Sequence, residues 1–494
     1  MSTPNPSANA PAQRQVFYRA LSSKDNRFDG VFFTGVKTTG IYCRPVCGVK
    51  TPKFDSCEFF HSAAAAEAAG FRPCLRCRPE LAPYDVQQNL AHAIWHKIAE
   101  GALNELSLDQ FAEQVGLSSR QVRRVIQDEF GVSPVELAQT QRLLFAKKLL
   151  QETELSMTDV AYAAGFGSVR RFNALFAERY NLAPGALRQR KSSSSNSLQL
   201  RLAYRPPFAW DALIQYLAGR AMAGMEAVVQ EAGGAYYIRS VSMENYQGWL
   251  KVSHLPQKQQ LLIDIAPSLL PVLQNLLARV RRQFDLEANP ATIAQHLSDD
   301  KLLAAIVQAM PGLRVPGAFD NMELGLRAIL GQQVSVAGAT TISGRLVARF
   351  GTACQSPYPQ LNHFFPDANT LANASIDEIS SLGMPGRRAA TIKHFAEFCQ
   401  HGGLQLKPGS ELAEVIHQLK QLPGIGEWTA QYIAMRALRF PNAFPAGDLG
   451  LQKAAAKLAD DASDRWGESK LAEHSQVWAP WRSYAAMYLW QSLS

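Results

Sequence analysis

The chain has 494 residues, of which 47% are hydrophobic, as in ordinary globular domains. The chain is too long to fold around one hydrophobic core. A typical domain size of about 150 residues predicts three or four domains. The formal net charge is +8, with 24 Lys and Arg against 18 Asp and Glu up to residue 200 and 26 against 24 beyond it. This basic front end favours an anionic partner, although charge alone does not separate a nucleic acid from a membrane surface. No apolar run reaches the roughly 18 residues of a membrane span, and the first 15 residues lack a signal peptide's apolar region, so we expect a soluble cytoplasmic protein.

Residues 1–15 are rich in Pro, Ala, Ser and Asn, which predicts a disordered leader. Residues 16–83 combine short β-like runs with four cysteines, as in a small α+β domain that needs a metal. Cys43-Arg-Pro-Val-Cys47 and Cys74-Leu-Arg-Cys77 are two loops that can each place two thiolates on one tetrahedral ion. Four sulfurs predict a Zn²⁺ site, because an odd total of seven cysteines fits reduced thiols better than a disulfide framework. By spacing alone, the simplest interpretation is a structural zinc site that stabilises a domain too small to fold without it.

The sequences around these cysteines, Thr38-Thr-Gly-Ile-Tyr-Cys-Arg-Pro-Val-Cys47 and Ala69-Gly-Phe-Arg-Pro-Cys-Leu-Arg-Cys77, resemble the methylphosphotriester-sensing domain of the Ada adaptive-response regulators. The resemblance implies that Cys43 is both a zinc ligand and the nucleophile that takes a methyl group from a DNA phosphotriester. A zinc-bound thiol is deprotonated and stays nucleophilic at neutral pH, and its alkylation removes one negative charge. Methylation is therefore expected to tighten DNA binding. Nearby candidate phosphate contacts, each equally well explained as a solvated loop charge, are Arg44, Arg72 and Arg76.

Residues 84–190 show helical periodicity. The segment from Ser107 to Ile126 predicts a capped helix, a turn at Gly116 and a second capped helix, and the pattern recurs from Ser156 to Phe172. Two such units joined by a helix resemble the AraC/XylS-type tandem DNA-binding domain, whose helices would read the major groove. A helical bundle without DNA is the alternative. The expected DNA-facing residues are Arg120, Gln121, Arg124, Ser168, Arg170 and Arg171.

Residues 191–199 predict a flexible Ser-rich linker. Beyond it, residues 200–267 alternate aromatic and β-branched residues in strand-like runs, and residues 268–494 predict an all-α domain of helices separated by Gly and Pro turns. The expected fold class is therefore multidomain, mainly α with α+β parts: a small zinc-bound α+β domain, a tandem helix-turn-helix domain, a small β-containing domain and an all-α domain.

The run Gln421-Leu-Pro-Gly-Ile-Gly-Glu-Trp-Thr-Ala-Gln-Tyr432 is a helix-hairpin-helix signature, in which Gly424 and Gly426 let the backbone approach a phosphate. About twenty residues later a lone carboxylate, Asp448, follows a Gly/Pro turn. This spacing resembles the helix-hairpin-helix glycosylase superfamily. The runs Arg327–Val336, Leu382–Pro385 and Trp481–Ala485 narrow the resemblance to the AlkA-type 3-methyladenine DNA glycosylases. It implies DNA contacts at Gly424, Gly426 and Thr429, with a monovalent cation on the hairpin carbonyls in many relatives.

The resemblance makes Asp448 the catalytic group, which would stabilise an oxocarbenium-like sugar and orient or deprotonate the attacking water. A purine alkylated at N3 or N7 is cationic, so aromatic faces attract it once it is flipped out of the duplex. Trp428 stands where lyases of the superfamily carry their Schiff-base lysine, which implies a monofunctional hydrolase. Gln333 aligns with the family's intercalating leucine, so the DNA wedge is polar here or is supplied by Val334. The residues implied for the base pocket, each also explained by ordinary core packing, are Trp428, Tyr432, Trp490, Trp210 and Tyr216.

The leading hypothesis is an Ada-type sensor and transcriptional activator fused to an AlkA-type glycosylase. Its expected partners are double-stranded DNA, both alkylated and promoter, and RNA polymerase, and we expect a monomer. One alternative keeps the regulator but makes the glycosylase-like half a non-catalytic DNA-binding module. Another is an AraC-type regulator that senses a small molecule and uses zinc only as a staple. Asp448 with the hairpin glycines argues against the first, and the lack of a recognisable cupin domain argues against the second.

Overall fold

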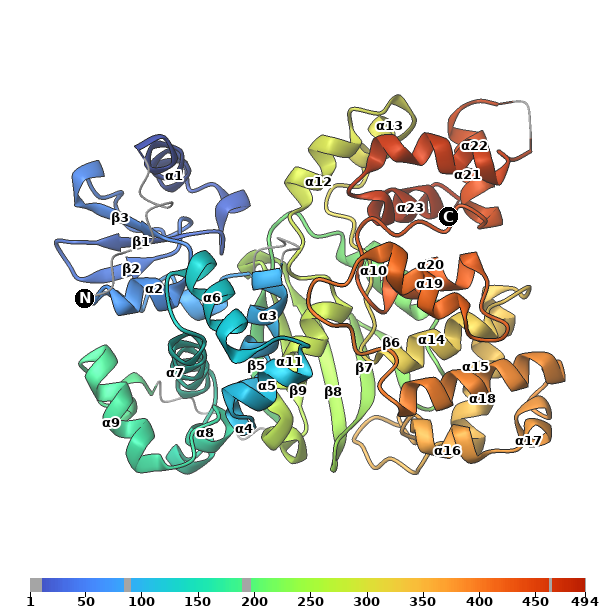
Figure 1. The fold of residues 1–494 in the computed structure, drawn as a ribbon, viewed down its shortest axis with the longest axis horizontal. Coiled ribbons are helices and arrows are strands. Elements are labelled where there is room, and N and C mark those ends of the chain that lie inside the picture. Colours follow the sequence, from blue (N-terminus) through green and yellow to red (C-terminus); the bar gives the residue numbers. More distant parts are fainter. Residues whose placement is uncertain (1–10, 84–89, 189–196, 462–463, 494) are drawn as a thin grey trace.

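The structure, a computed structural model, describes residues 11–83, 90–188, 197–461 and 464–493. Figure 1 shows the two N-terminal units on one side of a five-stranded sheet and a helical domain on the other. The expectation of a multidomain, mainly helical chain with small sheets is confirmed. Among the helices of the described residues, none combines the length and the apolar character needed to cross a bilayer.

The N-terminal unit is built on a four-stranded sheet of order β3-β1-β2-β4. The prediction of a disordered leader is wrong for residues 11–15, which begin α1. That helix forms because Phe17 and Leu21 are buried against Phe32 and Phe59, with the rings of Phe17 and Phe32 stacked at 4.3 Å. Residues 1–10 lie outside the described residues. The elements are α1 (Pro11–Ser23), β1 (Phe33–Val36), β2 (Ile41–Cys43), β3 (Cys57–Phe60), α2 (Ala63–Ala68) and β4 (Arg72–Pro73).

The second unit contains the two expected helix-turn-helix pairs. Ser107 and Ser118 each close a capping box at the start of α5 and α6. The turns need left-handed backbone, and glycine supplies it at Gly116 (φ 72°) and Gly165 (φ 81°). The helices are α3 (Leu90–Ala99), α4 (Ala102–Glu105), α5 (Leu108–Gln114), α6 (Ser119–Phe130), α7 (Pro134–Glu152), α8 (Met157–Ala163) and α9 (Val169–Tyr180).

Helix α7 is the central helix of the N-terminal half. It contacts α2 of the first unit, α3 and α8 of its own unit and β5 of the next domain. The apolar cluster around Leu143 and Leu149 continues through Phe172 to Leu200 and Ile263 in the sheet. Fully burying one such side chain stabilises the fold by about 1.5–3 kcal/mol. The second helix-turn-helix unit and the five-stranded sheet therefore share one core.

Glu67 on α2 ties the first unit to the second. Its fully buried carboxylate accepts hydrogen bonds from the Tyr42 hydroxyl (3.0 Å) and the Thr140 hydroxyl (3.0 Å), and it pairs with the Arg179 guanidinium (3.1 Å). Burial raises the pKa of the Glu67 carboxyl to about 7, because loss of hydration outweighs the opposing effect of Arg179. The Glu67 carboxyl at this interface therefore gains or loses its charge near neutral pH.

We expect Glu67→Gln to reduce the pH dependence of stability. The folded pKa of about 7 lies above the ordinary value of 4.5, so the stabilisation from the neutral carboxyl is complete below about pH 4.5 and is lost as the pH rises through about 7. Gln keeps a neutral acceptor at every pH. Thermal midpoints of the full chain at pH 5 and pH 8 measure this, with Glu58→Gln as control, because Glu58 is half-exposed and pairs only at the surface with Lys37. Equal pH dependence of wild type and Glu67→Gln contradicts the prediction.

The third unit is an antiparallel sheet of order β5-β9-β8-β7-β6. The predicted linker of residues 191–199 ends too late, because Leu198 and Gln199 already pair with Ile265 and Asp264. Residues 191–196 lie outside the described residues. The elements are β5 (Leu198–Ala203), α10 (Trp210–Ala218), β6 (Glu226–Glu231), β7 (Gly234–Met243), β8 (Tyr246–Leu255), β9 (Gln260–Ile265) and α11 (Leu273–Gln283).

The fourth unit is all helical, and its apolar core runs from Ala288 to Leu489 around the fully buried Trp478. This core brings α20, α21 and α23 together. The helices are α12 (Pro290–Leu297), α13 (Lys301–Ala309), α14 (Asn321–Leu330), α15 (Val336–Phe350), α16 (Ala368–Asn373), α17 (Ile376–Ser380), α18 (Gly386–Gln400), α19 (Leu412–Lys420), α20 (Glu427–Arg436), α21 (Leu449–Leu458), α22 (Glu468–His474) and α23 (Arg482–Gln491).

Candidate functional site

The four paired cysteines meet at the edge of the first sheet. Strand β2 pairs in parallel with β4, and the amide of Cys74 donates to the carbonyl of Tyr42 (3.0 Å), which sets Cys43 beside Cys74. The Sγ atoms of Cys43, Cys47, Cys74 and Cys77 all lie within 4.8 Å of one another. Four thiols at this spacing fit a tetrahedral Zn²⁺ site, as the sequence predicts.

The candidate phosphate contacts around this metal centre divide into two groups. Arg44 is bound internally: its guanidinium pairs with Asp29 and donates to the carbonyl of Cys77 (3.2 Å). The prediction that Arg44 contacts phosphate is therefore not supported, because its donors already hold the two metal loops together. Arg76 is exposed and Arg72 is half-buried in β4, so both stay candidates. Three of the metal-centre cysteines are buried, and Cys77 is half-buried.

All six predicted DNA-facing residues of the helix-turn-helix pairs are exposed. In α6, Arg120, Gln121 and Arg124 lie opposite the buried Val122 and Ile126. Ser168 caps the start of α9, and Arg170 and Arg171 of this helix point away from its buried Phe172 and Phe176. Two of the six also have local partners, since the Gln121 side chain accepts from the amide of Ser118 and the Ser168 hydroxyl accepts from the amide of Arg171. The four arginines are therefore the stronger candidates for DNA contact.

The predicted hairpin joins α19 to α20. Gly424 has φ 84°, and a Cβ there would lie 2.0 Å from the Thr391 hydroxyl. Gly426 is exposed, with open space beside it, and caps the start of α20, where free amides can meet a phosphate. The Thr429 side chain is 3% exposed, and its hydroxyl accepts from the Gln332 amide (2.9 Å), so only its backbone amide in the first turn of α20 stays a candidate for DNA contact. Thr429 belongs to the support of the hairpin.

The predicted wedge lies in the turn between α14 and α15. Gln333 is exposed and has a left-handed backbone (φ 55°), and its neighbour Val334 is 38% exposed. Sequence reasoning missed Gln332, the residue before Gln333. The Gln332 side chain donates to the carbonyl of Gly424 (2.9 Å) as well as to Thr429, and so connects the wedge turn to the hairpin.

Asp448 is the N-cap of α21, and both of its carboxylate oxygens have donors. One oxygen accepts from the amide of Leu451 (3.0 Å) and from the indole N–H of Trp490 (3.0 Å). The other accepts from the indole N–H of Trp428 (2.9 Å). Three donors on a half-buried carboxylate fix its orientation. The predicted catalytic residue and two predicted pocket aromatics therefore form one hydrogen-bonded group.

Tyr432 extends this group into an aromatic cluster. Its ring lies parallel to Trp428, with centroids 5.4 Å apart and planes at 16°, and 6.2 Å from Trp490. Its hydroxyl receives a hydrogen bond from Arg436 (2.8 Å), a residue that sequence reasoning missed. The i, i+4, i+8 spacing of Trp428, Tyr432 and Arg436 on one helix was the available signal. Because Trp428 and Tyr432 stack on each other, a flipped base would meet the outer faces of the cluster.

The other two predicted pocket residues, Tyr216 and Trp210, do not bond to Asp448 and have other packing partners. The Tyr216 hydroxyl lies 3.3 Å from that of Tyr432, but its ring already contacts two guanidiniums, Arg220 at 3.7 Å and Arg436 at 4.9 Å. Tyr216 therefore supports Tyr432, and its ring has little face left for a cationic base. The prediction for Trp210 is wrong. It is 6% exposed and stacked on Phe284, because it lies on the face of α10 that packs on the sheet.

The indole hydrogen bonds lead to a matched pair of variants. Trp428→Phe keeps an aromatic ring and removes the donor to Asp448, and a hydrogen bond to a charged group is worth about 1.5–3 kcal/mol. We expect single-turnover base excision to slow about tenfold, while Trp428→Ala, which also loses the ring, weakens binding of the damaged base too. Trp466→Phe, which removes an indole–Asp461 bond elsewhere in the domain, is the control. Wild-type excision by Trp428→Phe contradicts the positioning role.

Four family models match successive parts of the chain. They are the metal binding domain of Ada (residues 16–80), a helix-turn-helix domain (111–190), the AlkA N-terminal domain (199–320) and the HhH-GPD superfamily of base excision DNA repair proteins (326–480). Their order along the chain is the order of the four structural units.

One curated relative matches nearly the whole chain, and others match its C-terminal part. The probable bifunctional transcriptional activator/DNA repair enzyme AlkA of Mycobacterium tuberculosis is 38% identical over 96% of both chains. DNA-3-methyladenine glycosylase 2 of Escherichia coli is 31% identical over 58% of this chain and 95% of its own. A 3-methyladenine DNA glycosylase structure from Archaeoglobus fulgidus shares the fold at a TM-score of 0.51 and 19% identity, over 59% of this chain and 97% of its own. The chain belongs to the family of bifunctional transcriptional activator/DNA repair enzymes, in which an Ada-type metal-binding domain and a helix-turn-helix domain precede an AlkA-type DNA glycosylase.

Proposed function

We propose that the C-terminal half hydrolyses the N-glycosidic bond of alkylated purines such as 3-methyladenine and 7-methylguanine. The observation that carries this is the Asp448 carboxylate, held by two indole N–H groups beside an aromatic cluster. The name of the Escherichia coli relative supports the substrate class.

In this mechanism the exposed hairpin and the start of α20 bind the DNA backbone, and Gln333 or Val334 fills the gap left by the flipped base. The cationic purine leaves with the electrons of its glycosidic bond, so it needs little protonation. Asp448 stabilises the developing positive charge on the sugar and orients or deprotonates a water, whose oxygen forms the new bond to C1′. Position 428, where lyases of the superfamily carry their Schiff-base lysine, is a tryptophan in this chain. We therefore propose a monofunctional hydrolase.

We propose further that Cys43 takes a methyl group from a DNA phosphotriester. Its sulfur forms a bond to the methyl carbon as the carbon–oxygen bond breaks, and the phosphate leaves as an ordinary diester anion. Zinc on the four cysteines keeps the thiols deprotonated. The product is not reversed by the chain itself, so each protein accepts one methyl group. Family membership in the Ada type supports this step.

The methylated sensor would then activate transcription. Its protein partner would be RNA polymerase, and the chain would act as a monomer in the cytoplasm. A monovalent cation would bind the hairpin carbonyls.

Methylation removes one negative charge near the phosphates, and screening by salt limits the gain in affinity, so we expect promoter binding to tighten about tenfold to a hundredfold. A salt titration with methylated and unmethylated protein measures this. Equal affinities at every salt concentration contradict the electrostatic switch.

One experiment tests both activities. The purified chain is incubated with methylated duplex DNA, released bases are identified by chromatography, and the protein is weighed by mass spectrometry. We expect release of 3-methyladenine and 7-methylguanine and a gain of one methyl group. Methyl gain without base release would instead favour a glycosylase-like half that only binds DNA.

A further inference from the structure

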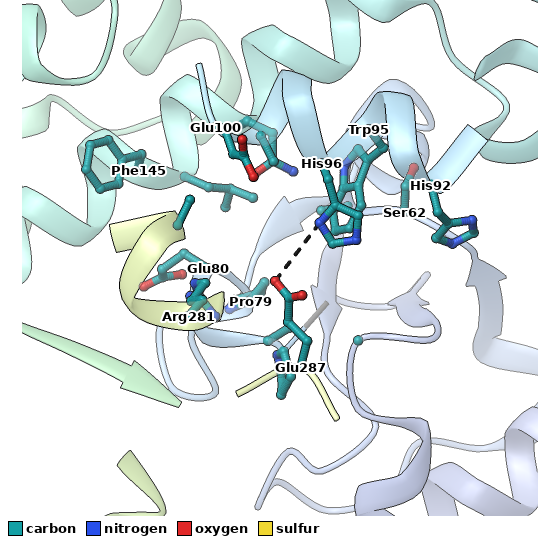
Figure 2. Close-up of a pocket in the computed structure, with 18 of the residues that line it drawn as sticks. Ser62, Pro79, Glu80, His92, Trp95, His96, Glu100, Phe145, Arg281 and Glu287 are labelled. Atoms are coloured by element: carbon teal, nitrogen blue, oxygen red, sulfur yellow. Dashed lines mark ion pairs between the residues drawn. The ribbon is translucent and has the colours of Figure 1, made fainter. Parts of the chain in front are cut away.

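Glu287 lies where the sensor, the helix-turn-helix domain and the glycosylase meet. It is 5% exposed and stands between α11 and α12, on the wall of a cavity of about 110 Å³ lined by all three parts. Figure 2 shows its carboxylate turned toward the ring of His96 on α3, at 4.0 Å. Its other oxygen pairs with Arg439 of the glycosylase at 2.8 Å. One carboxylate thus faces a group from each of two domains.

The charge on Glu287 persists despite its burial. Burial alone raises the pKa of the carboxyl, but the Arg439 guanidinium outweighs burial and the pKa falls to about 2. The carboxylate is therefore ionised throughout the physiological range. An ionised, buried carboxylate is held in place by its partners, because moving away from them would leave a charge in a poorly hydrated site.

The backbone of Glu287 is held from the sensor side. Arg205, 2% exposed, donates to the carbonyl of Glu287 and also, through two nitrogens at 2.6 and 3.1 Å, to the carbonyl of Asp29 in the sensor. A guanidinium is a planar fork, so it fixes the two carbonyls relative to each other. The carboxylate of the same Asp29 holds Arg44, the residue after the predicted nucleophile Cys43.

On the glycosylase side, Arg439 lies near the start of the segment that leads to the predicted catalytic residue. This segment, residues 437–447, connects α20, which carries Trp428 and Tyr432, to Asp448 at the start of α21. Arg439 itself has a left-handed backbone (φ 62°), so the segment turns sharply where Glu287 holds it. A shift there would be passed to Asp448, and small displacements of a catalytic group reduce rates strongly.

We propose that Glu287 and Arg205 are positioning residues of the glycosylase, and that the sensor domain supports them through the carbonyl of Asp29. Base excision then depends on a contact that the sensor domain makes, and the two halves of the chain work as one body. This inference rests on the glycosylase activity proposed above, so the wild-type chain is assayed first. If it releases no base, the proposed function fails; if it does, the variants test this inference alone.

The test uses Glu287→Gln and Arg205→Gln in the full chain. Glu287→Gln keeps the carbonyl that Arg205 holds and removes the ion pair with Arg439. For both variants we expect the single-turnover excision rate at saturating enzyme to fall about tenfold, while the Kd for damaged duplex changes less than about twofold. Hydrogen exchange of residues 437–447 should become faster in both. A merely structural role lowers the thermal midpoint but leaves the rate of the folded protein and the exchange of this segment unchanged.

A control breaks a different ion pair, one that joins the helix-turn-helix domain to the glycosylase near the same cavity. Glu100, directly after α3, pairs with Arg282 on α11, and that pair does not lead to the catalytic segment. We expect Glu100→Gln to excise at the wild-type rate. On the sensor side, Asp29→Asn releases Arg44 and loosens the turn that carries the supporting carbonyl, and we expect an excision rate about two- to threefold lower.

The outcomes separate the parts of the proposal. Wild-type rates for Glu287→Gln and Arg205→Gln overturn it. A slow Glu287→Gln with normal Arg205→Gln and Asp29→Asn leaves Glu287 as a positioning residue and overturns the role of the sensor. Equal slowing by Glu100→Gln shows a general effect of domain contacts and also overturns it.

Discussion

Asp448→Asn should slow base excision by orders of magnitude while damaged DNA still binds. The substitution keeps the shape, and Asn can still cap α21, but it removes the charge that stabilises an oxocarbenium-like transition state. Loss of one electrostatic stabiliser of this kind slows an enzyme by about a hundredfold to a thousandfold. The Asp448 carboxylate also accepts two indole N–H bonds, and the amide of Asn would face the indole of Trp428 or Trp490 with a donor.

The measurement is single-turnover release of 3-methyladenine and 7-methylguanine from methylated duplex DNA. Binding of the same DNA should persist or tighten, because a negative group near phosphates is lost. Asp211→Asn, an exposed aspartate in the first turn of α10, is the control for the loss of one negative charge. Near-wild-type excision by Asp448→Asn rules out its catalytic role.

Cys43→Ala should abolish methyl transfer, while base excision falls by no more than the two- to threefold expected for Asp29→Asn. The sensor loses its predicted nucleophile, whereas Asp448 and the aromatic cluster lie in a different domain. Mass spectrometry after exposure to methylphosphotriester DNA is expected to find one methyl group on Cys43 of the wild type and none on the variant. Cys57→Ala, a lone buried thiol in the same sheet, is the control.

Solvent exposure and family resemblance favour different cysteines as the methyl acceptor, so mass spectrometry can decide between them. Cys43 is 6% exposed, whereas Cys77 is half-buried and is the most accessible of the four cysteines. Accessibility alone would favour Cys77, and the family resemblance favours Cys43. A methyl group found on Cys77, or unchanged transfer by Cys43→Ala, contradicts the assignment of the nucleophile.

The chemistry of this protein is carried by short segments, and the sequence by itself determined those. Two cysteine pairs with short spacing are enough to predict a four-thiolate centre, because each loop has to supply two ligands to one ion. The helix starts at Ser107 and Ser118, and the hairpin at Gly424, depend on neighbouring residues only. Asp448 is assigned by the family resemblance that the hairpin and its distance to this carboxylate carry.

Only the tertiary structure decided which distant residues share these sites. Trp490 donates to Asp448 across 42 positions, and Arg205 reaches the Asp29 carbonyl across 176. Trp210 and Thr429 were expected in binding sites and are buried, and Arg44 was expected at phosphate and pairs with Asp29. A residue type states which interactions a side chain can make, but packing chooses among them, since a buried polar group has to take whichever partner the folded chain brings within reach.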